Sequence, residues 1–319
     1  MSDTSGMSVR MASLQLCGHG AELALFREAL AKGRMPHAWL VTGPPGIGKA
    51  TFAFALARIL LGGEAEEHPV GRRISAATHA DLLVVERGYD EKKQRYRQEI
   101  VADDVRPINA FLRRTAAEGG WRVVIVDGAE WMNRSAANAV LKILEEPPPA
   151  TVLVLTSSAP GRLLPTIRSR CRRLELAPLP QADMRRVLHT LWPDLPEQDF
   201  LRILSQSHGA PGKAVALLAD SGGGVAALVA EVLQGVSALR GYEIAETVLR
   251  KDYGFGLFFA LLADQLQSTA RQAAKAGSSQ CITLAAAWEQ IMRVHTETER
   301  FNLDKQEALI EAMTIASPE

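Results

Sequence analysis

Short apolar runs alternate with stretches of helical period through the first half of the chain. Runs that are apolar almost throughout are typical of parallel strands covered on both faces. The predicted strands are Ala38–Thr42, Asp81–Glu86, Trp121–Asp127, Thr151–Thr156 and the weaker Arg172–Leu176. The helices predicted between them are Ala50–Leu61, Ala102–Ala117 and Ser135–Glu146. This alternation predicts a doubly wound α/β domain with a five-stranded parallel sheet.

The helix predicted at Ser135–Glu146 has clear signals at both ends. Ser135 or Asn133 can cap its first turn, and three successive prolines at 147–149 prevent its continuation. The polar, charged segment Gly88–Gln98 is predicted to be a loop.

Beyond Pro178 and Pro180 the strand pattern disappears and helical patterns remain. A small helical unit is predicted from three segments, Gln181–Leu191, Glu197–Gln206 and Lys213–Ala219. Three glycines at 222–224 indicate a linker, and the Ala- and Leu-rich remainder predicts a helical bundle. We therefore expect three parts, at residues 1–178, 179–221 and 222–319.

The composition limits the class of protein. The 319 residues include 36 basic and 36 acidic side chains, so the net charge is zero and argues against coating nucleic acid by bulk electrostatics. Hydrophobic residues make up 47% of the chain, enough for a sizeable core. No secretory signal pattern and no apolar run long enough to cross a bilayer are present, so we expect a cytoplasmic protein without a membrane partner. The three cysteines, Cys17, Cys171 and Cys281, are too far apart for a disulfide framework.

The strongest chemical motif follows the first predicted strand and opens a helix. It fits the pattern G-x-x-x-x-G-K of phosphate-binding loops, in which backbone N–H groups and the lysine hold phosphates. Its residues are Gly43, Pro44, Pro45, Gly46, Ile47, Gly48, Lys49, Ala50 and Thr51. The residue after the lysine usually gives a hydroxyl to Mg²⁺, which Ala50 cannot do. Thr51 lies about 100° further round the helix and is a poor substitute.

A second motif ends the third predicted strand at Asp127, where a carboxylate can hold Mg²⁺ directly or through water. ATPases of this class usually carry a glutamate next to it, and here that position is Gly128. We expect Glu130, two residues beyond, to point elsewhere. Since placed bases contribute about 10²–10⁴ to rates, hydrolysis in this site should be slow or absent. Alternatively, Asp127 merely caps the strand end.

Four segments together resemble the bacterial clamp-loader subunits, which belong to the AAA+ group of P-loop proteins. They are Ala31–Leu40, Ile100–Arg106, Asn138–Pro148 and Leu163–Cys171. The likeness extends from about Leu14 to Leu218, in order and with sensible spacing. It implies an AAA+ P-loop domain, a small helical lid and a C-terminal helical collar.

In this family the arginine of a Ser-Arg-Cys motif projects into ATP bound by the adjacent subunit. The match at Ser169, Arg170 and Cys171 implies that role, an arginine finger in trans, for Arg170. A guanidinium suits it because it stays charged and offers bidentate donors to phosphate oxygens. Without the resemblance, Arg170 fits a surface arginine ahead of a buried strand.

The departures from the family pattern identify the type of subunit. ATP-hydrolysing members keep Ser or Thr after the loop lysine, Glu after the acidic residue and Arg at the start of a lid helix; here Ala50, Gly128 and Gly212 occupy these positions. The stretch Gly209–Lys213 instead looks like the delta-prime branch, which implies a mostly non-hydrolysing member. Ser158, with Ser157 beside it, matches the family's polar sensor, although both fit simple strand-end residues.

Many family members carry a four-cysteine zinc module after the first helix, but residues 62–78 contain no cysteine. His68 and His79 alone cannot make a tetrahedral site, so we expect no zinc. ATP or ADP, with Mg²⁺, is the expected ligand of the loop, bound weakly or without hydrolysis.

The resemblance implies a hetero-pentamer with gamma/tau ATPase subunits and delta, joined through the helical region from Val225 onward. Alternatively, that bundle buries its apolar face within a monomer. The ring would load a sliding clamp on primer–template DNA. Candidates for direct DNA contact are Asn138 and Lys142 or the arginine pairs, which also fit a solvated surface. The pairs are Arg72–Arg73 and Arg113–Arg114.

Two competing functions remain open at this point. One is an ATP-hydrolysing motor, either the gamma/tau-like clamp-loader subunit or a related AAA+ ATPase. The other is a nucleotide-sensing adaptor outside replication. Ala50, Gly128 and Gly212 favour the non-hydrolysing subunit over the motor. The chain carries no polymerase or nuclease constellation, so any nucleotidyltransferase activity would belong to the complex.

Overall fold

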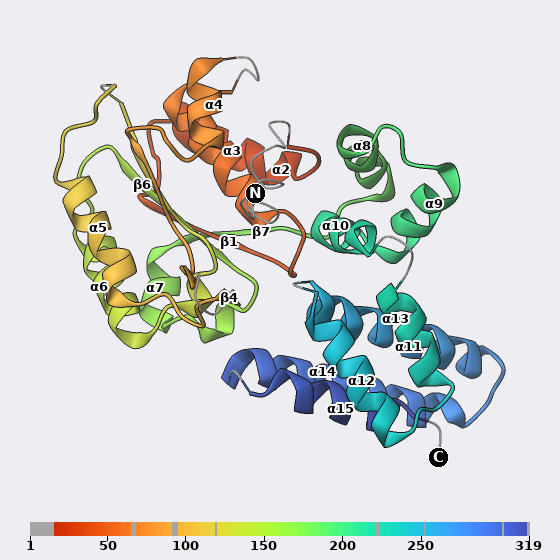
Figure 1. The fold of residues 1–319 in the computed structure, drawn as a ribbon. Coiled ribbons are helices and arrows are strands. Elements are labelled where there is room, and N and C mark those ends of the chain that lie inside the picture. Colours follow the sequence, from red (N-terminus) through yellow and green to blue (C-terminus); the bar gives the residue numbers. More distant parts are fainter. Residues whose placement is uncertain are drawn as a thin grey trace. The chain divides into compact units, whose positions relative to one another are not determined.

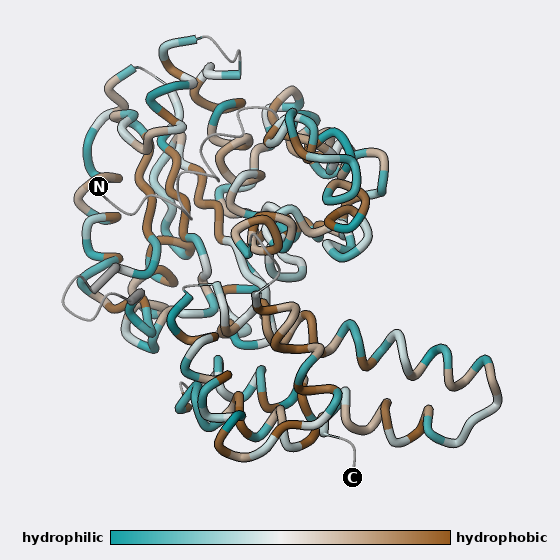
Figure 2. The backbone as a smooth tube through the Cα atoms, turned by 45° about the vertical axis from the view of Figure 1, so that its right-hand side comes forward, coloured by the Kyte–Doolittle hydropathy of each residue, from teal (hydrophilic) through white to brown (hydrophobic). Residues whose placement is uncertain are grey.

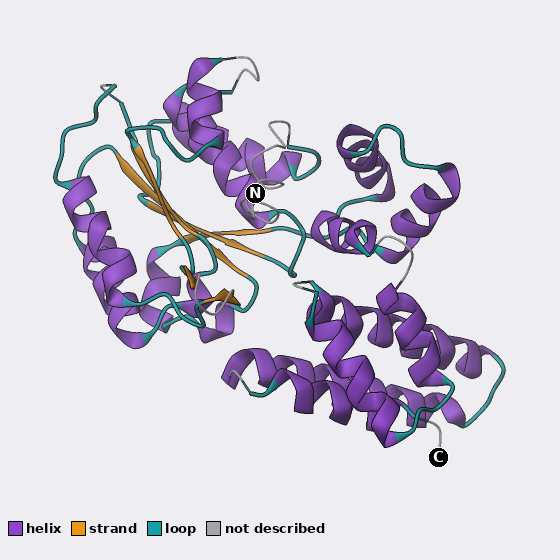
Figure 3. Cartoon of the chain, viewed as in Figure 1, coloured by secondary structure: helices purple, strands orange, loops and turns teal. Residues whose placement is uncertain are grey.

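The computed structural model describes residues 16–64, 68–90, 95–118, 120–220, 224–251, 253–301 and 303–317. The chain divides into two compact units (Figures 1 and 3). The first comprises Met1–Leu204 with His208–Gly212, and the second Ser205–Ser207 with Lys213–Glu319. The predicted division into three parts, 1–178, 179–221 and 222–319, stays a prediction.

The first unit is built on a five-stranded sheet in the order β2-β5-β6-β1-β7, in which every neighbouring pair is parallel. The strands are β1 (Ala38–Thr42), β2 (Leu82–Val85), β5 (Arg122–Val126), β6 (Thr151–Ser157) and β7 (Arg172–Glu175). All residues of β1, β5 and β6 are buried, which explains their nearly continuous apolar sequence. The predicted α/β class and five-stranded parallel sheet are confirmed.

The two faces of the sheet contribute alternate residues to separate cores, as the pleat requires. Trp39 and Val41 of β1 pack with α2, α3 and α4, whereas Ala38 and Leu40 pack with α5, α6 and α7. Figure 2 shows the strands as apolar segments between more mixed helices. The helices of this unit are α2 (Gly20–Ala31), α3 (Lys49–Leu61), α4 (Pro69–Ser75), α5 (Ala102–Leu112), α6 (Arg134–Glu145), α7 (Pro165–Arg170), α8 (Gln181–Leu191) and α9 (Glu197–Gln206).

Helix α5 ends at Leu112, so the predicted end at Ala117 is wrong. The reason is tertiary: the buried guanidinium of Arg122, at the start of β5, donates to the carbonyl oxygens of Leu112 and Arg114. It also donates to the Pro149 carbonyl at 2.8 Å. One arginine therefore supplies hydrogen-bond donors both to carbonyl groups at the end of α5 and to the proline loop.

Two further local predictions are refined. Asn133, not Ser135, caps α6, since its side chain accepts a hydrogen bond from the Ala136 N–H. The polar segment Gly88–Gln98 is not all loop, because β3 (Tyr89–Asp90) pairs antiparallel with β4 (Arg95–Tyr96). Residues 91–94 lie outside the described residues.

The second unit is helical, as expected for a bundle, and contains a long hairpin of α13 and α14. Its helices are α10 (Pro211–Ala219), α11 (Gly224–Leu233), α12 (Ala238–Leu249), α13 (Gly254–Lys275), α14 (Gln280–Phe301) and α15 (Lys305–Ala316). The buried Asp220 carboxylate accepts hydrogen bonds from the Val225 and Ala226 N–H groups and from Lys251. Among the described helices none alone is long and apolar enough to cross a bilayer, and one bent pair, α10 with α11, meets that test together.

Candidate functional site

The predicted phosphate-site residues gather at one edge of the sheet. The loop follows β1, Asp127 follows β5 and Ser158 follows β6, and parallel strands end at the same edge. We call this the carboxyl edge, and the opposite one, where the strands begin, the amino edge.

Glycines give the phosphate loop its shape. Gly43, Gly46 and Gly48 have φ angles of 150°, 75° and 95°, which residues with side chains rarely adopt. A Cβ on Gly43 would lie 2.4 Å from the Leu176 carbonyl oxygen, so no side chain fits there. Pro44, Pro45 and Gly46 are exposed, while the buried Ile47 anchors the loop in the core.

Lys49 is buried at the start of α3, where its ammonium donates to two carbonyl oxygens of the loop. The Nζ–O distances are 3.0 Å to Gly43 and 2.8 Å to Pro44. Burial lowers the pKa of Lys49, and the carboxylates of Glu130 and Asp127 oppose that shift. Ala50 and Thr51 follow as half-buried residues of α3, without a hydroxyl at the metal-binding position.

Asp127 is held by the neighbouring strand. Thr156 Oγ1 donates to Asp127 Oδ1 at 2.6 Å and accepts from the Gly128 N–H at 2.9 Å. The buried Thr156 thus fixes the carboxylate at the carboxyl edge, beside Lys49, where a phosphate-bound cation would lie. Ser157 Oγ accepts from the Ala159 N–H at 3.2 Å, a turn contact.

Gly128 leaves no room for a glutamate. Its φ is 74°, and a Cβ there would lie 2.8 Å from Cδ1 of Trp131. That indole ring is covered by two guanidinium groups, Arg87 at 4.3 Å and Arg162 at 5.0 Å from its centroid. A glutamate at this position would be strained by the backbone conformation and would press on Trp131.

Glu130 does not point elsewhere, so that expectation is wrong. The left-handed turn at Gly128 starts a short 3-10 helix, Ala129–Trp131, which returns the Glu130 side chain to the site. Its Oε1 accepts from the Ser158 N–H at 2.9 Å, and its Oε2 is buried without a hydrogen-bond partner among the described residues. Sequence reasoning missed this carboxylate because its direction depends on one turn.

Gly212, the last residue of the first unit, is hydrogen-bonded directly to the phosphate loop. The Gly212 N–H donates to the Gly46 carbonyl at 2.7 Å, and a Cβ on Gly212 would lie 2.8 Å from Gly46 Cα. An arginine at this position would displace the loop. The next residue, Lys213, belongs to the second unit and forms an ion pair with Asp264 of the same unit.

Arg170 lies at the amino edge, away from the phosphate loop. It ends α7, two residues before β7, and β1 places about 15 Å of strand between the two edges. Its guanidinium contacts Glu145 Oε1 at 3.0 Å and the Thr166 carbonyl at 3.1 Å, and its side chain is 36% exposed. Arg170 therefore cannot serve its own phosphate loop but is accessible from outside.

The remaining candidates lie outside the carboxyl-edge constellation. Asn138 and Lys142 are exposed on α6. The arginines at 72, 73, 113 and 114 are also exposed, and Arg73 pairs with Glu118. His68 Nδ1 caps α4, and His79 Nδ1 accepts from the Asp81 N–H at 3.0 Å. Among the described residues, no three His, Cys, Asp or Glu side chains come together as a metal site.

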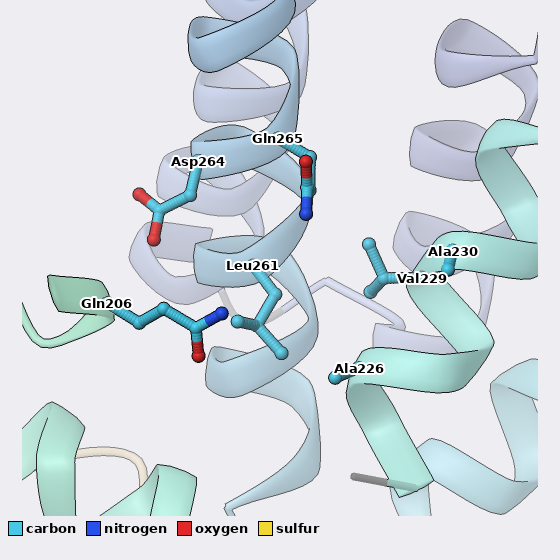
Figure 4. Close-up of a pocket in the computed structure, with 7 residues that line it drawn as sticks. All are labelled: Gln206, Ala226, Val229, Ala230, Leu261, Asp264 and Gln265. Carbon is cyan, nitrogen blue, oxygen red and sulfur yellow. The ribbon is translucent and has the colours of Figure 1, made fainter. Parts of the chain in front are cut away.

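The second unit contains a small cavity of about 60 Å³, shown in Figure 4. Val229 and Leu261 line it together with the polar side chains of Gln206 and Asp264. Its volume suits a few water molecules and no nucleotide. The carboxyl edge thus remains the candidate nucleotide site, and its glycine loop, Lys49 and Asp127 fit phosphates and a cation.

The family model and the sequence relatives indicate one family. The family model described as "DNA polymerase III, delta subunit" matches residues 18–180. The DNA polymerase III subunit delta' of Pseudomonas aeruginosa is 38% identical over 238 residues, 72% of this chain and 69% of the relative. That of Escherichia coli is 35% identical over 195 residues, 58% of this chain and 55% of the relative. A solved gamma subunit-related protein of Thermotoga maritima is 20% identical, with a TM-score of 0.46 over 92% of this chain and 98% of that one.

Proposed function

The chain belongs to the family of DNA polymerase III delta-prime subunits, and on that premise we propose that it is a non-hydrolysing member of a clamp loader. In this role it joins gamma/tau ATPase subunits and delta in a cytoplasmic hetero-pentamer. The complex loads a sliding clamp on primer–template DNA, and this chain reaches the DNA through the complex.

The observation that carries the proposal is the placement of Arg170 opposite a phosphate site that lacks catalytic groups. Ala50, Gly128 and Gly212 replace the metal hydroxyl, the water-polarising carboxylate and the lid arginine. Arg170 is accessible and lies about one strand length from its own loop. This arrangement suits a protein that assists hydrolysis in a neighbour and performs none itself.

Arg170 would act by placing a fixed positive charge against the phosphates of an adjacent subunit's ATP. A planar guanidinium can donate to two phosphate oxygens at once and stabilises charge that develops during phosphoryl transfer. Arginine fingers contribute about 10³–10⁵ to turnover, equivalent to about 4–7 kcal/mol of barrier. Glu145 orients the side chain before the neighbour's phosphates replace it as partner.

The chain's own loop would hold ATP or ADP weakly. Loop N–H groups and Lys49 would contact the phosphates after Lys49 leaves its two carbonyl partners, and Asp127 would face Mg²⁺. Mg²⁺ would supply charge neutralisation on the phosphates. Because Ala50 offers Mg²⁺ no ligand, we expect weak binding of nucleotide without cleavage.

Reconstitution tests the proposal. The purified chain should co-elute with gamma/tau and delta subunits, and the assembled complex should hydrolyse ATP in the presence of clamp and primed DNA. Alone, the chain should show no turnover. Turnover on the order of one per second by the isolated chain would favour the motor function. Failure to recover the replication subunits would favour an adaptor outside replication.

A further inference from the structure

Glu130 is a carboxylate at the carboxyl edge that the proposed function does not use. Its Oε1 accepts from the Ser158 N–H at 2.9 Å, while its Oε2 is buried and has no hydrogen-bond partner among the described residues. A buried carboxylate oxygen without a donor is unfavourable unless a positive charge compensates it.

The strand register brings this carboxylate towards Lys49. Thr42 of β1 pairs with Ser157 of β6, and the next residues of the two strands are Gly43 and Ser158. The Gly43 carbonyl accepts from Lys49 Nζ at 3.0 Å, and the Ser158 N–H donates to Glu130. Glu130 thus bonds to Ser158 and Lys49 bonds to Gly43, and these two residues directly follow a register pair on neighbouring strands.

The hydrogen bonds of Lys49 leave its charge uncompensated, since both acceptors are neutral carbonyl oxygens. Burial lowers the pKa of Lys49, and Glu130 opposes that shift more than Asp127 does. In a phosphate loop that binds nucleotide, the phosphates supply this negative charge.

We infer that Glu130 is a positioning residue that stands in for nucleotide phosphates as the counter-charge of Lys49. This inference rests on the proposed function, since it explains how an unliganded loop stays folded within a working complex. Glu130 stabilises the empty loop and, by repulsion, opposes nucleoside di- and triphosphates. The Gly212–Gly46 hydrogen bond acts in the same direction, because it occupies a loop carbonyl from the lid side.

The test uses Glu130→Gln in the full chain, because the amide oxygen can still accept from Ser158 N–H while the charge is lost. The first measurement is ADP affinity by calorimetry, with Mg²⁺ and with EDTA. We expect ADP to bind about tenfold more tightly in both buffers, since a nearby negative charge has been removed. The second is amide hydrogen exchange of residues 43–49 without nucleotide, which we expect to become faster.

Glu146→Gln is the matched control. The substitution removes the same charge, but Glu146 is exposed and lies at the amino edge. It should change neither affinity nor exchange. Weaker ADP binding by Glu130→Gln only when Mg²⁺ is present would make Glu130 a cation ligand and overturn the inference. Unchanged affinity together with unchanged exchange would also overturn it.

If neither the original chain nor Glu130→Gln binds ADP at millimolar concentration, the amide exchange of residues 43–49 alone tests the inference. Faster exchange in Glu130→Gln supports the inference, and equal exchange overturns it. Co-elution with gamma/tau and delta is a separate readout. Failure of the Glu130 inference therefore leaves the proposed clamp-loader role standing, and failure of co-elution leaves the Glu130 result interpretable.

Discussion

The two edges of one sheet differ in how their polar groups are satisfied. At the carboxyl edge, Lys49, Asp127 and the Gly46 carbonyl all bond to other groups of the same chain. At the amino edge, Arg170 and Glu145 form an ion pair with side chains that are 36% and 45% exposed. Internal satisfaction suits a site that works without a ligand, whereas an exposed pair can exchange partners at little cost.

On the proposed function, the carboxyl edge lacks the groups for hydrolysis while the amino edge retains Arg170. Strands β1, β5 and β6 between the edges are fully buried. Their packing depends on apolar side chains and not on the residues that end the strands. The strands between Arg170 and the phosphate loop therefore do not need the catalytic groups of the carboxyl edge for their packing.

The largest expected effect is that of Arg170→Ala in the reconstituted complex. ATP turnover at the site that receives the arginine should fall about 10³-fold or more, because the developing phosphate charge loses its partner. Subunit co-elution should be unchanged. Arg168→Ala, on the same helix and also exposed, is the control and should keep full activity. Equal loss in both variants would contradict the proposed role.

Cys171, next to Arg170, tests whether the amino edge is packed as described. Burial raises the pKa of its thiol to about 12. At pH 8 its alkylation in the folded chain should be about 10³-fold slower than in urea, as followed by mass spectrometry. Since folding raises this pKa, the stability it contributes is complete at neutral pH and lost as the pH rises towards 12. Fast labelling at pH 8 would show that this edge opens.

Gly128→Glu tests whether the lost base can be restored. The variant should unfold with about 1–3 kcal/mol less free energy in urea titrations, because Glu must adopt a positive φ against Trp131. It should gain no ATP turnover. Gly161→Glu is the control, since nothing lies within 4 Å of a Cβ there. A stable, hydrolysing Gly128→Glu protein would break the contrast between the two edges.

Gly212→Ala should have the smallest effect, a destabilisation of about 1 kcal/mol, because its Cβ would press on the backbone of Gly46. Gly256→Ala, in an exposed and open position of α13, should instead stabilise by about 0.5–1 kcal/mol. Thermal unfolding of both variants measures the two changes in stability. Stabilisation by both would mean that Gly212 does not pack closely against Gly46.

The sheet could be predicted from sequence to within about two residues per strand because buried parallel strands are continuously apolar. The predicted end of α5 failed because Arg122, ten residues further on, ends that helix through its carbonyl bonds. The β3–β4 pair was not predicted, because its segment is polar and shows no strand period. Both errors arise from contacts that a local pattern does not contain.

The phosphate loop and Asp127 could be found because their residue types and spacing carry chemistry. Glu130 could not, since its direction depends on the positive φ of Gly128. A glycine directly after a strand-end aspartate was the available signal. The proposed role of Arg170 rests on the resemblance, and the structure adds its distance from the chain's own loop.

Helix α6 connects the two edges mechanically. Its N-cap, Asn133, comes just after the turn that carries Glu130, and its last residue is Glu145, the partner of Arg170. A helix of 12 residues is about 18 Å long. On the proposed role of Arg170, a tilt of this helix at its capped end would move Glu145 and so change the direction of the guanidinium.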